Sequence, residues 1–198
     1  MDFYILDVFA ETKYTGNQLA VFAGAETANL SHEEMLQIAR EMNYSETTFI
    51  LSSEKRNGGY DVQIFTPTKE LPFAGHPTLG TAYIIKREII KNMVDKVILN
   101  LAVGQIPVSW KGEVLWMGQN VPTFAQKHQV ETLAEVLNVE VVDIYTRFPI
   151  QEVSTGIPFI IVPLKTMAAL KKSQVNLYKY YQFILSSKLV YKAFVSKY

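Results

Sequence analysis

Short apolar runs separated by turns dominate the first part of the chain. The runs at 2–9, 19–23 and 47–52 are rich in aromatic, β-branched and other apolar residues, which predicts strands. Between the last two runs, Ser31 precedes Glu34 by three positions, the spacing of a capping box. The apolar residues that follow have the spacing of one face of an α-helix, and they are Met35, Ile38, Ala39 and Met42. The pattern therefore predicts strands around one amphipathic helix.

A second helix, predicted over 76–89, has a different pattern. It follows a strand at 60–66, which we expect to form a hairpin with 47–52 and which Pro67 ends. Pro77 suits the start of a helix, where its missing N–H costs nothing. No charged residue appears before Lys86, and apolar groups lie on several sides. This favours a buried central helix surrounded by sheet.

The rest of the chain also mixes strands and helices. Apolar runs predict strands at 96–102, 105–110, 113–117, 140–146 and 158–163, and helices at 130–138, 166–172 and 175–195. Strands and helices recur loosely in both halves, which indicates an α+β protein with two related lobes. We expect the first lobe over 1–112 and the second over 113–198.

The amino-acid composition limits the kinds of catalytic and binding site that the chain is able to form. The 198 residues include no cysteine, which excludes disulfides and thiol nucleophiles, and the three histidines are scattered, so no metal motif is visible. A nucleotide-binding loop, a dinucleotide fingerprint and a nucleophile elbow are also missing from the sequence. The formal net charge is zero and no apolar stretch approaches a membrane span, so we expect a cytoplasmic protein without nucleic-acid or membrane partners.

Charge is nevertheless uneven along the chain. Residues 165–198 hold seven lysines and no acidic residue, which leaves 12 basic and 19 acidic residues before them. A basic aromatic tail is able to contact a membrane surface or a nucleic acid. The alternative, which we favour, is an amphipathic helix that packs on its own domain or on a protein partner.

Glu46 is the first candidate for chemistry. It lies where the loop 43–45 meets the apolar strand at 47–52. A carboxylate at the mouth of a buried strand is partly desolvated, and this suits it to proton transfer. The alternative is a solvated residue that merely starts the strand.

His76 is the second candidate. Gly75 allows a ligand to approach the backbone, and the helix that follows offers free N–H groups to a carboxylate. His76 itself is a possible donor to substrate, or simply a residue near a helix cap. Gly16-Asn17 and Thr155-Gly156 are weaker, because both are equally typical of ordinary turns.

Together these segments resemble the PhzF, or phenazine-biosynthesis-like, family. The resemblance is carried by DVFxxxxYTGNQLAVF, LSHEEMLQIAREMNYSETTFIL and IFTPTKELPFAGHPTLGTA, and more loosely by VSTGIPFIIVPL at 153–164. It implies the diaminopimelate-epimerase-like fold, with two pseudo-symmetric lobes that each wrap a barrel-like sheet around a central helix. It also implies an isomerase that needs no cofactor and moves a proton on a small carboxylate-bearing substrate.

The resemblance also assigns roles. It implies that Glu46 is the general acid/base and that His76 lines the active site beside it. Residues expected to border the substrate are Asn17, Ser45, Gly75, Pro77, Thr78, Thr155 and Gly156.

The sequence departs from the family at its end. Family members carry a further GxxEDPATGSA-type segment and a second central helix, neither of which is found here. We therefore expect an incomplete second lobe, whose uncovered apolar surface favours a homodimer. A non-catalytic remnant that binds a small anion or a protein partner is the alternative function.

Overall fold

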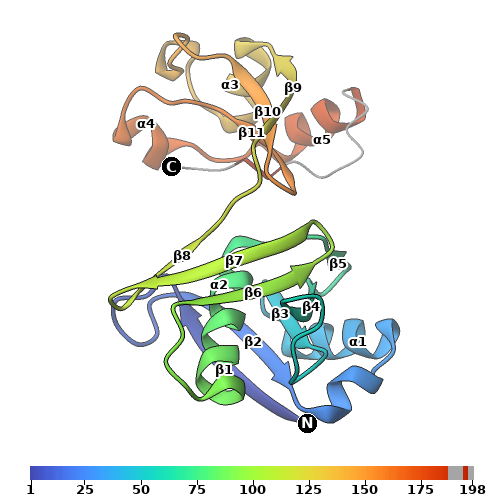
Figure 1. Cartoon of the computed structure of the whole chain (residues 1–198). Coiled ribbons are helices and arrows are strands. Elements are labelled where there is room, and N and C mark those ends of the chain that lie inside the picture. The colour runs from blue at the N-terminus through green and yellow to red at the C-terminus, as the bar shows by residue number, and fades with distance from the viewer. Residues whose placement is uncertain (187–193, 196–198) are drawn as a thin grey trace. The chain divides into compact units, whose positions relative to one another are not determined.

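The computed structural model describes residues 1–186 and 194–195, which form two compact units, Met1–Gln119 and Asn120–Tyr198 (Figure 1). The first unit consists of β1 (Asp2–Val8), β2 (Asn17–Ala23), the 3-10 helix η1 (Ala25–Asn29), α1 (His32–Met42), β3 (Glu46–Ile50), β4 (Tyr60–Phe65), β5 (Glu70–Leu71), α2 (Gly75–Ile84), the π-helix η2 (Ile85–Ile90), β6 (Lys96–Leu101), β7 (Gly104–Lys111) and β8 (Val114–Met117). The second consists of β9 (Thr123–His128), α3 (Val130–Leu137), the 3-10 helix η3 (Val141–Asp143), β10 (Ile150–Ser154), β11 (Pro158–Ile161), α4 (Met167–Lys172), α5 (Leu177–Ser186) and β12 (Phe194–Val195).

One curled sheet encloses α2 in the first unit. Its strand order is β1-β2-β3-β4-β6-β7-β8, with β5 paired to β4. Helix α2 packs against β1, β2, β3, β6, β7 and β8, and Figure 1 shows it in the hollow of the sheet. The charge-free pattern before Lys86 therefore corresponds to a helix surrounded by strands. Its backbone continues beyond Ile84 as the π-helical turn η2.

Strand β2 is buried on both faces. Ala20 and Phe22 pack with Phe49 and with Met35 of α1. On the other face, a Cβ added to Gly80 of α2 would meet Leu19 at 2.5 Å, so helix and strand are in close contact there. A strand that is covered on both faces has a continuous run of apolar residues in its sequence, and residues 19–23 show this pattern.

The second unit has its own sheet and core. Its strands are ordered β12-β11-β10-β9. Apolar side chains of α3, α5, β10 and β11 form one buried cluster, which includes Leu133, Ile150, Ile160 and Phe183.

Several predictions for the second unit are wrong. The expected strand at 140–146 is the 3-10 helix η3, because Glu140 and Asp143 form a local capping box that satisfies their backbone N–H groups. Ile144 makes only an isolated bridge with Leu164. Strands β9 and β10 were not predicted, since their exposed and half-buried positions give no clear alternation.

The predicted helix at 175–195 is only partly present. Helix α5 covers Leu177–Ser186, residues 187–193 lie outside the described part, and Phe194–Val195 form β12, a strand parallel to β11. Pairing with the edge of a sheet, a tertiary interaction, replaces the helix there. The expected lobe boundary at 112/113 falls inside the β7–β8 hairpin, whereas the units separate at 119/120.

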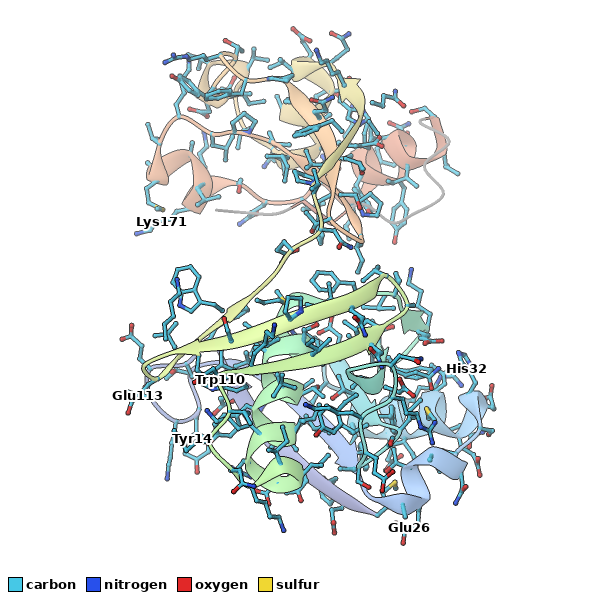
Figure 2. The ribbon with its side chains drawn as sticks, viewed as in Figure 1. Tyr14, Glu26, His32, Trp110, Glu113 and Lys171 are labelled. Carbon is cyan, nitrogen blue, oxygen red and sulfur yellow. The ribbon has the colours of Figure 1, made fainter. Side chains whose placement is uncertain are left out.

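Exposed side chains of the first unit include Tyr14, Glu26 and His32 (Figure 2). Within residues 1–186 and 194–195, no helix has both the length and the apolar character needed to span a bilayer. The same residues contain no group of three or more His, Cys, Asp or Glu side chains arranged to hold a metal ion.

Candidate active site

Four of the predicted site residues meet at one end of the first sheet. Asn17 begins β2, Ser45 and Glu46 stand at the start of β3, and His76 lies in the first turn of α2. Strands β2 and β3 are parallel, with Leu19 beside Glu46, so their first residues lie at the same edge. The fold thus joins three segments that are far apart in the sequence.

Gly16 explains why the chain reaches Asn17 in this position. A Cβ on residue 16 would lie 2.5 Å from the backbone oxygen of Val8 and 2.9 Å from the Cβ of Ala10. Real side chains do not tolerate such distances to backbone, so only glycine allows this turn to fold back against the end of β1. The YTGN motif is therefore a structural requirement that sets the position of Asn17.

His76 and Glu46 face each other in a buried setting. The Nε2 atom of His76 lies 3.5 Å from Oε2 of Glu46, and their side chains are 7% and 18% exposed. Neither of these two atoms has a hydrogen-bond partner within the protein. Burial lowers the pKa of His76 below its ordinary value, although the Glu46 charge and the backbone of Gln18 act in the opposite direction. This shift favours the neutral form of the imidazole.

The opposite side of the imidazole is hydrogen-bonded. Nδ2 of Asn17 lies 3.2 Å from Nδ1 of His76. The hydroxyl of Ser45 donates to Oδ1 of Asn17 over 3.1 Å. A chain of contacts therefore runs from Ser45 through Asn17 and His76 to Glu46.

The other predicted residues have different positions. Gly75 and Pro77 belong to the first turn of α2, with Pro77 third in the helix rather than first. The hydroxyl of Thr78 donates to the backbone oxygen of Ala74 over 2.7 Å, so it already has a partner. Thr155 and Gly156 lie in the β10–β11 connection of the second unit, and their role in substrate binding stays a prediction.

Phe9 is a residue of this region that the sequence reasoning missed. Its ring centroid is 6.4 Å from that of His76, and its side chain is 72% exposed. Its φ of 62° is in the left-handed region, which bulky residues rarely adopt. Such backbone strain is concentrated at functional sites. Nothing in the residue type signals this conformation.

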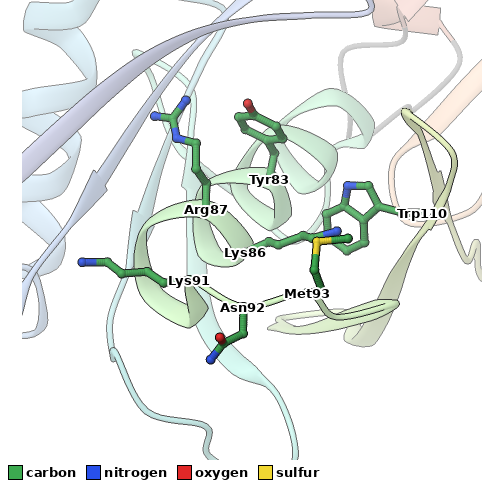
Figure 3. Close-up of a pocket in the computed structure, with 7 residues that line it drawn as sticks. All are labelled: Tyr83, Lys86, Arg87, Lys91, Asn92, Met93 and Trp110. Carbon is green, nitrogen blue, oxygen red and sulfur yellow. The ribbon is translucent and has the colours of Figure 1, made fainter.

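A separate pocket lies at the other end of α2. It has a volume of about 410 Å³ and is lined by Tyr83, Lys86, Arg87, Lys91, Asn92, Met93 and Trp110 (Figure 3). Lys86 stacks its ammonium 4.2 Å from the ring centroid of Trp110. Cations at this end suit the negative end of the helix dipole. None of the acid/base candidates lines this pocket.

Known proteins resemble the chain over most of its length. The family model described as phenazine biosynthesis-like protein matches residues 6–196. A trans-2,3-dihydro-3-hydroxyanthranilate isomerase from Pseudomonas aeruginosa is 36% identical over 173 residues, which cover 85% of this chain and 59% of that protein. This chain thus spans less than two thirds of the length of that relative.

Two solved structures share the fold. A predicted epimerase from Pseudomonas aeruginosa has a TM-score of 0.76 at 30% identity, covering 96% of this chain and 67% of that one. A Bacillus anthracis phenazine biosynthesis protein of the PhzF family has a TM-score of 0.75 at 26% identity, covering 89% and 60%. The mixed α+β fold expected from the motifs is confirmed. The match over residues 6–196, together with these relatives, shows that the chain belongs to the phenazine biosynthesis-like (PhzF) family.

Proposed function

We propose that this chain carries the acid/base centre of a cofactor-independent isomerase that moves a proton on a small carboxylate-bearing substrate. Glu46 takes a proton from a carbon acid and returns it at another position. The single observation behind this proposal is the buried, unpartnered pair of Glu46 Oε2 and His76 Nε2. Polar atoms that are buried without partners are costly, and a substrate would supply the missing contacts.

The start of α2 suits the substrate's carboxylate. Ala74, the N-cap residue, provides no side-chain hydrogen bond to the first turn. The first N–H groups of a helix have no partner within the helix and carry positive potential, so they favour an anion. We propose that these groups, with His76, hold the carboxylate and stabilise charge that develops in the transition state.

The relative named as an isomerase suggests the class of substrate to test. We propose a cyclic or amino-acid-like acid, and trans-2,3-dihydro-3-hydroxyanthranilate is the first compound to try. The full chain is incubated with it in D2O, and deuterium incorporation is followed by NMR. We expect exchange with the parent chain and a loss of roughly 10²-fold or more for Glu46→Gln.

The control for that experiment is Glu41→Gln. Glu41 is an exposed carboxylate near the end of α1, so the same chemical change there leaves exchange at the parent rate. If Glu46→Gln exchanges as fast as the parent, the assignment of Glu46 is wrong.

A second candidate is binding without turnover. Titration with anthranilate, an aromatic carboxylate of similar shape, separates the two. Saturable binding without any deuterium exchange supports the binding function, whereas exchange supports the isomerase.

A further inference from the structure

The contacts around His76 fix more than its position, because they decide which ring nitrogen carries the proton. We propose that Asn17 is a positioning residue that holds neutral His76 as the Nε2–H tautomer, with that proton facing Glu46. This rests on the proposed function in one respect only, namely that Glu46 acts as a carboxylate base.

The reasoning starts at the carboxylate. A carboxylate is only an acceptor of hydrogen bonds, so a bare imidazole nitrogen facing it would place two lone pairs together. Oε2 of Glu46 and Nε2 of His76 are 3.5 Å apart and both are buried. Low polarity makes such repulsion expensive. The one proton of a neutral ring therefore belongs on Nε2.

The tautomer then sets the rest of the chain of contacts. With its proton on Nε2, His76 has an acceptor at Nδ1, and the group 3.2 Å away is the Nδ2 amide of Asn17, a donor. This turns Oδ1 of Asn17 toward Ser45, whose hydroxyl donates to it over 3.1 Å. Ser45 donates to Asn17 and Asn17 donates to His76, while the Nε2–H faces Oε2 of Glu46 at 3.5 Å without a hydrogen bond between them.

The backbone of Gln18 also interacts with the ring and raises the pKa of His76, against the larger effect of burial. A direct measurement of the tautomer therefore decides which ring nitrogen carries the proton.

The tautomer has a consequence for chemistry. His76 enters the reaction with an N–H dipole that faces Glu46, so it stabilises the carboxylate electrostatically and does not remove a proton through Nε2. Proton abstraction is left to Glu46. Because the ring nitrogen that faces Asn17 is already engaged, Asn17 and Ser45 act through His76 rather than on the substrate.

Nitrogen-15 NMR of the full chain tests this directly. Long-range proton–nitrogen correlations at mildly alkaline pH, where imidazoles are neutral, distinguish a pyrrole-type from a pyridine-type nitrogen. His76→Gln identifies the signals of His76 by their loss. We expect the pyrrole-type signal on Nε2 in the parent chain, and its presence on Nδ1 would overturn the proposal.

Asn17→Asp is the sharpest variant. It keeps the shape of the side chain but replaces the amide donor with acceptors only, so we expect Nδ1 of His76 to become protonated, either in place of Nε2 or together with it in an imidazolium. Ser45→Ala removes the group that orients the amide and should give a mixture of tautomers. Asn57→Asp introduces the same change in an exposed turn and should leave the His76 signals as they are. An unchanged Nε2–H state in Asn17→Asp contradicts the proposal.

Activity provides a second, separable measurement. Where the parent chain exchanges deuterium, Asn17→Asp should slow exchange on the order of 10²-fold, the lower range for a positioned acid/base group. If the parent shows no exchange, the proposed function fails, but the tautomer is still decided by NMR. Should Asn17→Asp not fold, as judged from its amide spectrum, the parent tautomer and Ser45→Ala decide the question.

Discussion

At the residue scale, Glu46 is a candidate for catalysis because of the residues that surround it. Its local sequence equally fits a carboxylate that starts a strand, and the notable feature is the buried imidazole 3.5 Å away. The two residues are 30 positions apart in the sequence, so no local pattern joins them. Motif resemblance placed both in one site. The orientation of each ring nitrogen and carboxylate oxygen came only from the structure.

His76 should give the chain a measurable dependence on pH. Burial makes the pKa of folded His76 lower than that of the unfolded chain, so the unfolded state binds more protons below about 6.5. The free energy of unfolding should therefore fall as the pH drops through about 6.5, until the folded pKa is reached. At higher pH this contribution is constant. Urea denaturation at a series of pH values measures it.

Two variants isolate this effect. His76→Gln has no imidazole to titrate at this position, so its stability should decline less over the same acidic interval. His32→Gln alters an exposed ring on α1 (Figure 2) and should keep the acidic decline of the parent, because His76 is intact. Parallel pH profiles for His76→Gln and the parent would refute the prediction.

At the element scale, burial explains which helices and strands were recognisable. Helix α1 carries a capping box and one apolar face, both of which are written in consecutive residues. Helix α2 is apolar on several sides because strands surround it. Strands β9 and β10 have mostly exposed or half-buried side chains, so they leave little hydrophobic pattern. Burial therefore explains why β9 and β10 were missed, although β1 and β8, whose side chains are also mostly exposed or half-buried, were predicted.

Gly80 is where α2 packs most closely on the sheet. A Cβ there would lie 2.5 Å from Cδ2 of Leu19 and 2.9 Å from Cγ2 of Val8. We expect Gly80→Ala to lower the free energy of unfolding by about 1–3 kcal/mol, since overpacking outweighs the higher helix propensity of alanine. Thermal or urea denaturation measures this change.

Gly75 provides the matched control in the same helix. A Cβ on Gly75 would meet only the Cε of Met117, at an ordinary 3.8 Å. Gly75→Ala should therefore keep the stability of the parent or raise it slightly. Equal losses for both substitutions would show that close packing at Gly80 is not what requires glycine.

At the scale of the whole molecule, the chain forms two compact units with separate cores. The second unit exposes several large apolar side chains to solvent. On α5, Leu177, Tyr181 and Leu185 are 64%, 61% and 83% exposed and recur every four residues, which places them on one face. The homodimer expected from the sequence stays a prediction, and this stripe is the surface we propose for it.

Sedimentation velocity tests the dimer. We expect a dimer at micromolar concentration, and Leu185→Glu should weaken it at least about tenfold, because a charge would be buried in an apolar contact. Gln182→Glu adds the same charge on α5 outside the stripe and should leave the dimer intact. A parent chain that sediments as a monomer would rule the dimer out.

The sequence by itself determined the family, the mixed α+β class and the two helices α1 and α2, and it singled out Glu46 and His76, for which we propose the roles above. These features depend on short motifs and on the periodic spacing of buried residues, and both can be read from residues that are close together in the sequence. Only the tertiary structure decided that Asn17 contacts His76, that Phe9 is strained beside it and that β8 belongs to the first sheet. Such contacts join segments whose separation along the chain is large, and their energies depend on distances and orientations that no local pattern encodes.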